Sequence, residues 1–317
     1  MTVSNNAPQV LRGLAFALVG YAIYSAHDAI VKSLSGYSVF QIIFFAMLFV
    51  YVPFSLIRLT DGRKVRYRPR HPFLVFLRAL LVVGATAFAF MAFSMLPMVE
   101  VYVLLFTTPL LISILAIPLL GEKIHLFRWV MILIGMVGVI IVLRPSPDSF
   151  KLGHVLGLAG AACGSGVAII TRMIGRVESA PTMILSPLLM NITVSGLALY
   201  FVYKPMALAD LAMMFLMGTM SLAAQLAILE AYRKAPATVI APMQYSQLLW
   251  AVFYGALLFN ESVDTMTIIG ASITAGAGIM MVWRESYASK VQPVIKTGNI
   301  RAPEPEEDEA AASSPSP

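Results

Sequence analysis

The chain has 317 residues, of which 59% are hydrophobic and 12% are charged, and its mean hydropathy is +0.83. Soluble domains carry about 25% charged residues, so this composition excludes a soluble globular protein and predicts an integral membrane protein. The net charge of +6 does not indicate nucleic acid, because the basic residues lie in loops beside apolar segments.

Ten apolar segments are long enough to cross a membrane, since a spanning helix needs about 20 mostly apolar residues. They occupy residues 11–34, 38–59, 73–94, 98–120, 126–144, 153–174, 182–203, 208–232, 236–259 and 264–284. Glycine and proline lie at the joints, so the linkers are short and no soluble domain is inserted. The first segment is too long for a signal-peptide core and lacks a cleavage site, so we expect the mature protein to begin near Met1.

The basic residues predict the orientation, because loops rich in Lys and Arg stay in the cytoplasm. With the N-terminus inside, 18 of the 22 Lys and Arg residues fall on the cytoplasmic side, several of them between Arg63 and His71. The outer side has the other four, which are Lys32, Arg144, Lys151 and Lys204. We therefore predict a multi-pass protein of the bacterial inner membrane with both termini in the cytoplasm. Membrane lipid is an expected partner of the basic loop.

The first segment holds a polar face inside an apolar helix. Residues at helical spacing and their neighbours form this face: Tyr21, Tyr24, Ser25, His27, Asp28 and Lys32. Ionisable groups within a membrane usually face a cavity or a partner, so Asp28 and His27 are candidates to bind a proton or a cationic substrate group. The alternative is a structural Asp28–Lys32 pair near the outer interface, with His27 donating to a carbonyl.

Glu100 lies one turn into the fourth segment and shares a face with Thr107. If buried, Glu100 would be a proton-coupling carboxylate, and Thr107 would be a candidate substrate contact. At the membrane interface Glu100 would only favour the positive end of its helix.

Small residues repeat every three or four positions in the sixth segment, at Gly153, Gly157, Ala161 and Gly164, which predicts close helix contact. The single cysteine, Cys163, excludes an intramolecular disulfide and fits a packing role. Asn191 in the seventh segment and Gln225 in the eighth are weaker candidates for substrate contact.

The ninth segment is the richest in polar and aromatic side chains. Gln247, Trp250 and Tyr254 share one face, Gln244 lies one turn earlier and Tyr245 adjoins it. Amide groups pair with both donors and acceptors, and aromatic rings offer flat faces, so we predict that these residues line a cavity for a ring system. The alternative is that they join helices, as polar side chains do in bilayers.

Two segments of the chain repeat each other. Leu96 to Glu122 aligns with Ala235 to Glu261 at an offset of 139 residues, which places Pro97 on Pro236. The first segment aligns with the sixth, and Lys32 then falls on Arg176. Each half has five segments, and an odd number predicts that the second half enters the membrane from the opposite face. Inverted repeats of this kind are typical of secondary transporters, with the substrate site at the midplane.

The helix that begins with Pro and ends in LLGE (119–122) or LFNE (258–261) resembles the EamA branch of the drug/metabolite transporter superfamily. The segment with Arg128, Trp129, Gly135, Gly138 and the Arg144-Pro145 step resembles the family's fifth helix. The likeness covers residues 11–284. It implies an all-α fold of ten transmembrane helices in two inverted five-helix repeats, with a central cavity. The second copy departs from the pattern at Asn260, where the first has Gly121, and at Leu248, where it has Pro109.

The predicted organisation is a cytoplasmic N-terminus (1–10), two repeats (11–144 and 153–284) and a disordered acidic, proline-rich tail (285–317). No phosphate-binding loop, metal-spaced His/Cys set or nucleophile triad is present, so no enzyme activity, metal or cofactor is expected. Homo-oligomer formation stays open.

We expect a secondary transporter that moves a small organic metabolite by alternating access. The first candidate substrate is a heteroaromatic solute such as riboflavin, and the alternatives are an amino acid or S-adenosylmethionine. A rival hypothesis is a membrane sensor or assembly subunit that transports nothing, and a membrane enzyme is a third.

Overall fold

The computed structural model describes residues 7–60, 69–121, 126–144, 151–175, 177–235 and 237–291, and within these ranges it contains helices and no strand. The first half contains α1 (Ala7–Ser33), α2 (Val39–Thr60), α3 (Pro72–Met95), α4 (Met98–Leu105), α5 (Thr108–Leu120) and α6 (Leu126–Leu143). The second half contains α7 (Leu152–Ile174), α8 (Ala180–Val202), α9 (Leu208–Lys234), α10 (Ala237–Ile240), the 3₁₀ helix η1 (Ala241–Ser246), α11 (Gln247–Phe259) and α12 (Thr265–Val291). The last helix thus continues beyond the predicted end at residue 284, and the rest of the predicted tail, 292–317, lies outside the described residues.

The described helices are those of a multi-pass membrane protein. Six segments are long and apolar enough to cross a membrane, and α4 with α5 counts as one of them. Three shorter apolar helices lie in the described residues of α2, α6 and α12. Large apolar side chains such as Leu197 and Phe201 stand on the outside, where lipid would cover them.

Both repeat-defining segments are broken helices, although the sequence predicts two continuous ones. The first is interrupted between Leu105 and Thr108, and the second changes to 3₁₀ geometry before α11. The offset of 139 residues places the start of α5, Thr108, on the start of α11, Gln247. The two breaks therefore occupy equivalent positions in the two repeats.

Proline explains the first break. Pro109 has no N–H to donate to the carbonyl of Leu105, and the Thr108 hydroxyl donates to that carbonyl instead, at 2.6 Å. Thr107 does the same for Leu104, at 2.7 Å. In the second repeat a proline, Pro242, lies in the first turn of η1.

The two broken helices also end alike. Gly121 terminates α5 with φ 67° and Asn260 terminates α11 with φ 52°, both in the left-handed region. Asn is the residue that tolerates this region best after Gly, so the sequence difference at this position preserves the same helix end.

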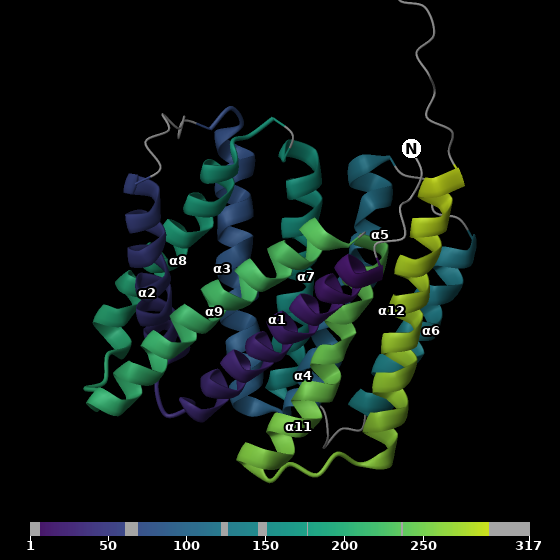
Figure 1. The fold of residues 1–317 in the computed structure, drawn as a ribbon. Helices are drawn as coiled ribbons and strands as arrows, with labels where there is room; N and C mark the ends of the chain where they lie inside the picture. Colours follow the sequence, from purple (N-terminus) through teal and green to yellow (C-terminus); the bar gives the residue numbers. More distant parts are fainter. Residues whose placement is uncertain are drawn as a thin grey trace, which may run out of the picture.

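The two halves pack against each other through antiparallel helices. In Figure 1, α1 and α9 cross the front of the molecule together, and α6 lies beside α12. The pair α3 and α7 on the far side is the repeat equivalent of α9 and α1. Each of these contacts joins the first half to the second, as inverted repeats require.

Glycine and cysteine permit close approach at these crossings. A Cβ atom on Gly138 of α6 would lie 2.5 Å from the Thr274 hydroxyl oxygen and 2.7 Å from the Gly270 carbonyl oxygen of α12. A Cβ atom on Gly84 of α3 would lie 3.1 Å from the sulfur of Cys163, which therefore packs at the contact between α3 and α7.

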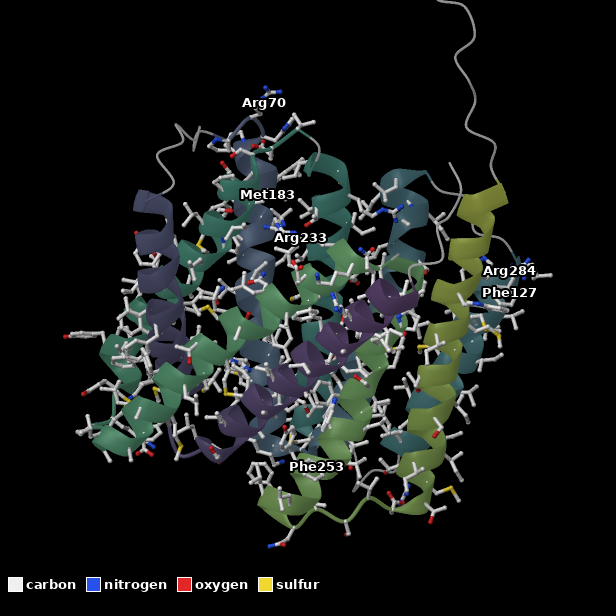
Figure 2. All side chains as sticks on the ribbon, viewed as in Figure 1. Arg70, Phe127, Met183, Arg233, Phe253 and Arg284 are labelled. Atoms are coloured by element: carbon white, nitrogen blue, oxygen red, sulfur yellow. The ribbon has the colours of Figure 1, made fainter. Side chains whose placement is uncertain are left out.

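The connections lie on two faces. The distal face, as we name it, holds the ends of α1, α3, α8 and α11, and the terminal face holds the end of α12. In Figure 1 α12 ends at the top of the view and the connection between α11 and α12 lies at the bottom. At the terminal face, the Arg78 guanidinium of α3 donates to the carbonyl of Met183 at 2.8 Å, and Arg284 stacks 4.0 Å from the ring centroid of Phe127 (Figure 2).

Candidate substrate and coupling sites

Asp28 of α1 is the centre of a polar cluster between the two halves. One carboxylate oxygen accepts a hydrogen bond from the hydroxyl of Tyr102, at 2.5 Å, and the other lies 2.9 Å from Nδ1 of His27. The His27 ring is buried and packs against Phe90 at 5.8 Å between ring centroids. Both groups predicted from the first segment therefore lie together inside the protein.

Tyr102 of α4 completes this cluster, and sequence reasoning missed it. Its ring is buried between Phe93 and Phe106, and its hydroxyl donates to Asp28 and lies near the side chains of Ser25 and Gln247. It thus connects α1 of the first half to α11 of the second. The signal available was a hydroxyl in the start of the fourth segment, which apart from Glu100 is apolar.

The predicted face of the ninth segment is divided by the break. Trp250 stacks on Tyr254, with ring centroids 6.3 Å apart and planes at 29°, and both are half-buried. Gln247, at the start of α11, lies near the Tyr102 hydroxyl, and Gln244 is half-buried in η1.

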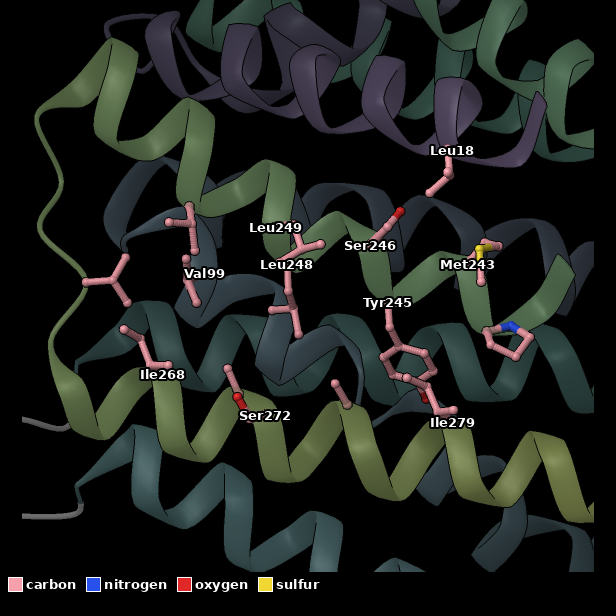
Figure 3. Close-up of a pocket in the computed structure, with 15 residues that line it drawn as sticks. Leu18, Val99, Met243, Tyr245, Ser246, Leu248, Leu249, Ile268, Ser272 and Ile279 are labelled. Carbon is pink, nitrogen blue, oxygen red and sulfur yellow. The ribbon is translucent and has the colours of Figure 1, made fainter. Parts of the chain in front are cut away.

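Tyr245 points elsewhere, into the contact between η1 and α12. Its ring packs against Phe106 at 4.8 Å, and its hydroxyl fills the space beside Gly278. It lines an apolar groove of about 430 Å³ that opens along α11 and α12, shown in Figure 3 with Ser246, Leu249 and Ile279. Because Phe106 ends α4 and Tyr245 lies near the end of η1, their contact brings the two helix breaks together.

The remaining predicted contacts are spread more widely. Tyr24 is half-buried one turn before Asp28, whereas Gln225 is exposed on α9. Asn191 is buried in α8 and donates to the carbonyl of Pro187 at 3.0 Å. The Thr107 hydroxyl donates to the carbonyl of Leu104 at the helix break.

Glu100 does not join the Asp28 cluster. It lies on the opposite side of α4, where its carboxylate is 3.2 Å from Nε2 of His154 in α7. The pair borders a distal cavity of about 350 Å³ whose lining includes Arg144, Lys151 and Asp264. His154 was not predicted, because one His at the start of an apolar segment carries no spacing signal.

Lys32 pairs with Glu261 of the second half and not with Asp28. Its ammonium is 2.7 Å from the Glu261 carboxylate, donates to the carbonyl of Leu96 and lies 5.4 Å from the ring centroid of Phe259. The structural alternative of an Asp28–Lys32 pair is therefore wrong. Glu261 also accepts from the backbone N–H of Met98 at 3.1 Å, which caps the start of α4.

The field at the centre has both signs. The helix α5 begins at the first break, so its positive N-terminal end lies in the interior, and the Asp28 carboxylate provides a negative charge. The helix α11 continues directly from η1, where the Gln247 N–H donates to the carbonyls of Gln244 and Tyr245. Within the described residues no group of three His, Cys, Asp or Glu side chains could hold a metal ion. The arrangement suits a ligand with charges of both signs and a ring.

Comparison with known proteins identifies a family and several relatives. The model of the EamA-like transporter family matches residues 11–144 and 151–284. An S-adenosylmethionine uptake transporter of Rickettsia bellii is 28% identical over 281 residues, which cover 87% of this chain and 95% of that protein. A riboflavin transporter of Vibrio cholerae is 29% identical over 196 residues, which cover 61% of this chain and 65% of that protein.

A pseudopaline exporter of Pseudomonas aeruginosa is 22% identical over 203 residues, which cover 61% of this chain and 68% of that protein. A solved crystal structure aligns with a TM-score of 0.58 at 15% identity, over 90% of this chain and 99% of that one, which supports the fold.

Proposed function

This chain belongs to the EamA-like transporter family, and on that premise we propose that it carries a zwitterionic metabolite with a ring system, of the S-adenosylmethionine type, across the bacterial inner membrane. Its relatives are named as transporters of small metabolites, which supports a transporter and not an enzyme. Alternating access of the two repeats about the central cluster is the proposed mechanism.

The proposed topology has ten crossings. The nine apolar segments of the described residues, together with η1 and α11 as one broken helix, supply them. Basic residues dominate the terminal face, so we propose that both termini lie in the cytoplasm and that the distal face is periplasmic.

The Asp28 cluster carries the substrate proposal. A carboxylate beside Tyr102 and Tyr24, with the His27 ring packed on Phe90, is suited to a sulfonium or ammonium group, which carboxylates attract and aromatic faces stabilise. The positive end of α5 suits the carboxylate of the same molecule. Trp250 and Tyr254 would then stack on its adenine ring, and Gln247 and Gln244 would bond to its edge.

Asp28 and His27, predicted as proton-coupling residues, have a different role in this proposal: Asp28 binds the cation and His27 orients Asp28. Riboflavin is the second candidate, because the amides and stacked rings of α11 also fit a neutral heteroaromatic solute. The two candidates differ in charge, and Asp28 therefore discriminates between them.

The test is binding of radiolabelled S-adenosylmethionine and riboflavin to purified protein, followed by uptake and efflux in vesicles. We expect Asp28→Asn to weaken S-adenosylmethionine binding about 10- to 100-fold, since a charged hydrogen bond contributes about 1.5–3 kcal/mol. Tyr102→Phe should weaken S-adenosylmethionine binding less. Gln247→Ala and Trp250→Ala should each weaken the binding of either ligand.

Tyr37→Phe is the matched control, because Tyr37 donates to Asp210 at the same distance of 2.5 Å, away from the cluster. Unchanged S-adenosylmethionine binding in Asp28→Asn would reject the cation assignment. Wild-type protein that moves neither ligand in either direction would favour a sensor or assembly subunit.

A further inference from the structure

We propose that Glu100 and His154 form a proton-binding site at the distal face, separate from the substrate cluster, and that α4 links the two. The inference rests on the proposed transport function for its coupling role. The proton site itself follows from the geometry around His154.

The hydrogen bonds of His154 determine which of the two residues accepts a proton. The backbone N–H of Lys151 donates to Nδ1 of His154 at 3.0 Å, so Nδ1 is an acceptor and Nε2 carries the ring hydrogen. Nε2 therefore donates to the Glu100 carboxylate at 3.2 Å. A second proton on the ring would have to face the Lys151 N–H, so the proton that the pair takes up goes to Glu100.

Solvent and charge surround the pair on several elements. The distal cavity brings together Glu100 of α4, His154 and Lys151 at the start of α7, Arg144 at the end of α6 and Asp264 before α12. Arg144 pairs with Asp264, so the charges of these two residues offset each other. The Glu100 carboxylate is partly exposed and the His154 ring is buried, which gives the proton a path from the cavity to the carboxylate.

The short helix α4 connects this pair to the substrate cluster. Glu100 on one side of α4 contacts α7, Tyr102 on the other side contacts Asp28 of α1, and the first N–H of α4 is held by Glu261. Protonation of Glu100 removes its negative charge and weakens its hold on His154. The polar contact between α4 and α7 is then weaker while Leu104 stays packed against Gly157 of α7, so we expect α4 to tilt and the Tyr102 hydroxyl to shift at Asp28.

Glu100→Gln is the decisive variant, because it keeps the size of the side chain and fixes it in a neutral form. In vesicles, we expect wild-type protein to move protons when S-adenosylmethionine is added on one side, as reported by a pH-sensitive dye. Glu100→Gln should lose the proton movement and keep exchange of labelled for unlabelled substrate. The matched control is Glu230→Gln, which changes a half-buried carboxylate that pairs with Lys234 near the end of α9.

His154→Asn is the second variant, since its shorter side chain has no group at the Nε2 position that contacts Glu100, and Glu100 stays ionisable. This variant should shift the pH profile of proton movement. If His154 had only a structural role, the pH profile would not change. Proton movement that survives in Glu100→Gln, or wild-type transport without proton movement, would overturn the proposal.

A measurement without substrate separates this proposal from the proposed function. The difference in thermal unfolding midpoint between wild type and Glu100→Gln should change with pH, and the difference for Glu230→Gln should follow a different profile. A constant difference for Glu100→Gln would reject the proton site even if the substrate were wrongly assigned.

Discussion

Glu178, in the connection between α7 and α8, shows how one carboxylate can make part of the fold sensitive to pH. It is buried and accepts hydrogen bonds from the backbone N–H groups of Arg70, at 2.8 Å, and His71, at 2.6 Å. Burial raises the pKa of Glu178, but these hydrogen bonds and the His71 ring together outweigh burial, so its pKa is lowered.

A lowered pKa in the folded state predicts stability that is lost in acid. The contribution of Glu178 should be complete above the ordinary Glu value of about 4.3 and should disappear as the pH falls through the lowered pKa. Thermal unfolding of wild type and Glu178→Gln in detergent checks this: the wild type should be more stable at neutral pH, and the two should converge in acid. A difference that is independent of pH would contradict it.

The sequence predicted a functional residue where a polar or charged side chain interrupts an apolar segment. Asp28 and His27 stand out in an apolar segment, and the structure brings them together. Tyr102 and His154 did not stand out, because their importance comes from partners 74 and 54 residues away in the chain. Lys32 suggested a local partner at helical spacing, but Glu261 of the other repeat is the one it binds.

At the scale of helices, the length of each apolar run predicts where a membrane segment lies. It does not predict that the helix is interrupted within that segment. The apolar run continues through both breaks, so the period of the pattern does not change there. The signals were Pro109 beside two threonines and Pro242 in the equivalent helix, where a missing N–H leaves a carbonyl to be satisfied by other groups. The starts of α5 and α11, and not the two prolines, share the offset of 139 residues, which shows that the break belongs to the repeat.

The close contact between α6 and α12 predicts that an added methyl group there destabilises the protein. Gly138→Ala would place a methyl group against Gly270 and Thr274 of α12, where backbone atoms lie within 2.9 Å of the new Cβ. The helices must separate, and we expect a loss of about 1–3 kcal/mol of stability, measured as a lower thermal midpoint. Gly276→Ala in α12 is the control, because nothing lies within 4 Å of its added Cβ. Equal midpoints for both variants would show that the crossing adapts freely.

At the scale of the whole molecule, polar contacts join the halves on both faces, and Arg78 and Glu178 make those of the terminal face. The contacts on the distal face include Lys32–Glu261, Tyr37–Asp210, Gln41–Lys204, Glu100–His154 and Arg144–Asp264. Among them, the Lys32–Glu261 pair joins the end of α1 to the end of α11 and to the start of α4, the helices around the Asp28 cluster. We therefore interpret this conformation as closed on the distal side, with this ion pair as the contact that must open.

Charge reversal tests that interpretation. The pair is largely buried, with 16% and 13% of the two side chains exposed, so Lys32→Glu or Glu261→Lys alone places two like charges together at a cost of roughly 3–5 kcal/mol. We expect each single variant to open the distal face and to speed labelling of a cysteine introduced by Gln247→Cys in a Cys163→Ala background, using a membrane-impermeant reagent.

The double variant with both charges exchanged should restore slow labelling in part, because the attraction returns with the opposite polarity but the contacts with the Leu96 carbonyl and the Met98 N–H do not. Lys234→Glu, which reverses a charge in a pair with Glu230 near the end of α9, should leave labelling from the distal side unchanged. If the double variant labels as fast as either single variant, the ion pair does not close this face. If all variants label slowly, the remaining contacts between the halves are sufficient to hold it shut.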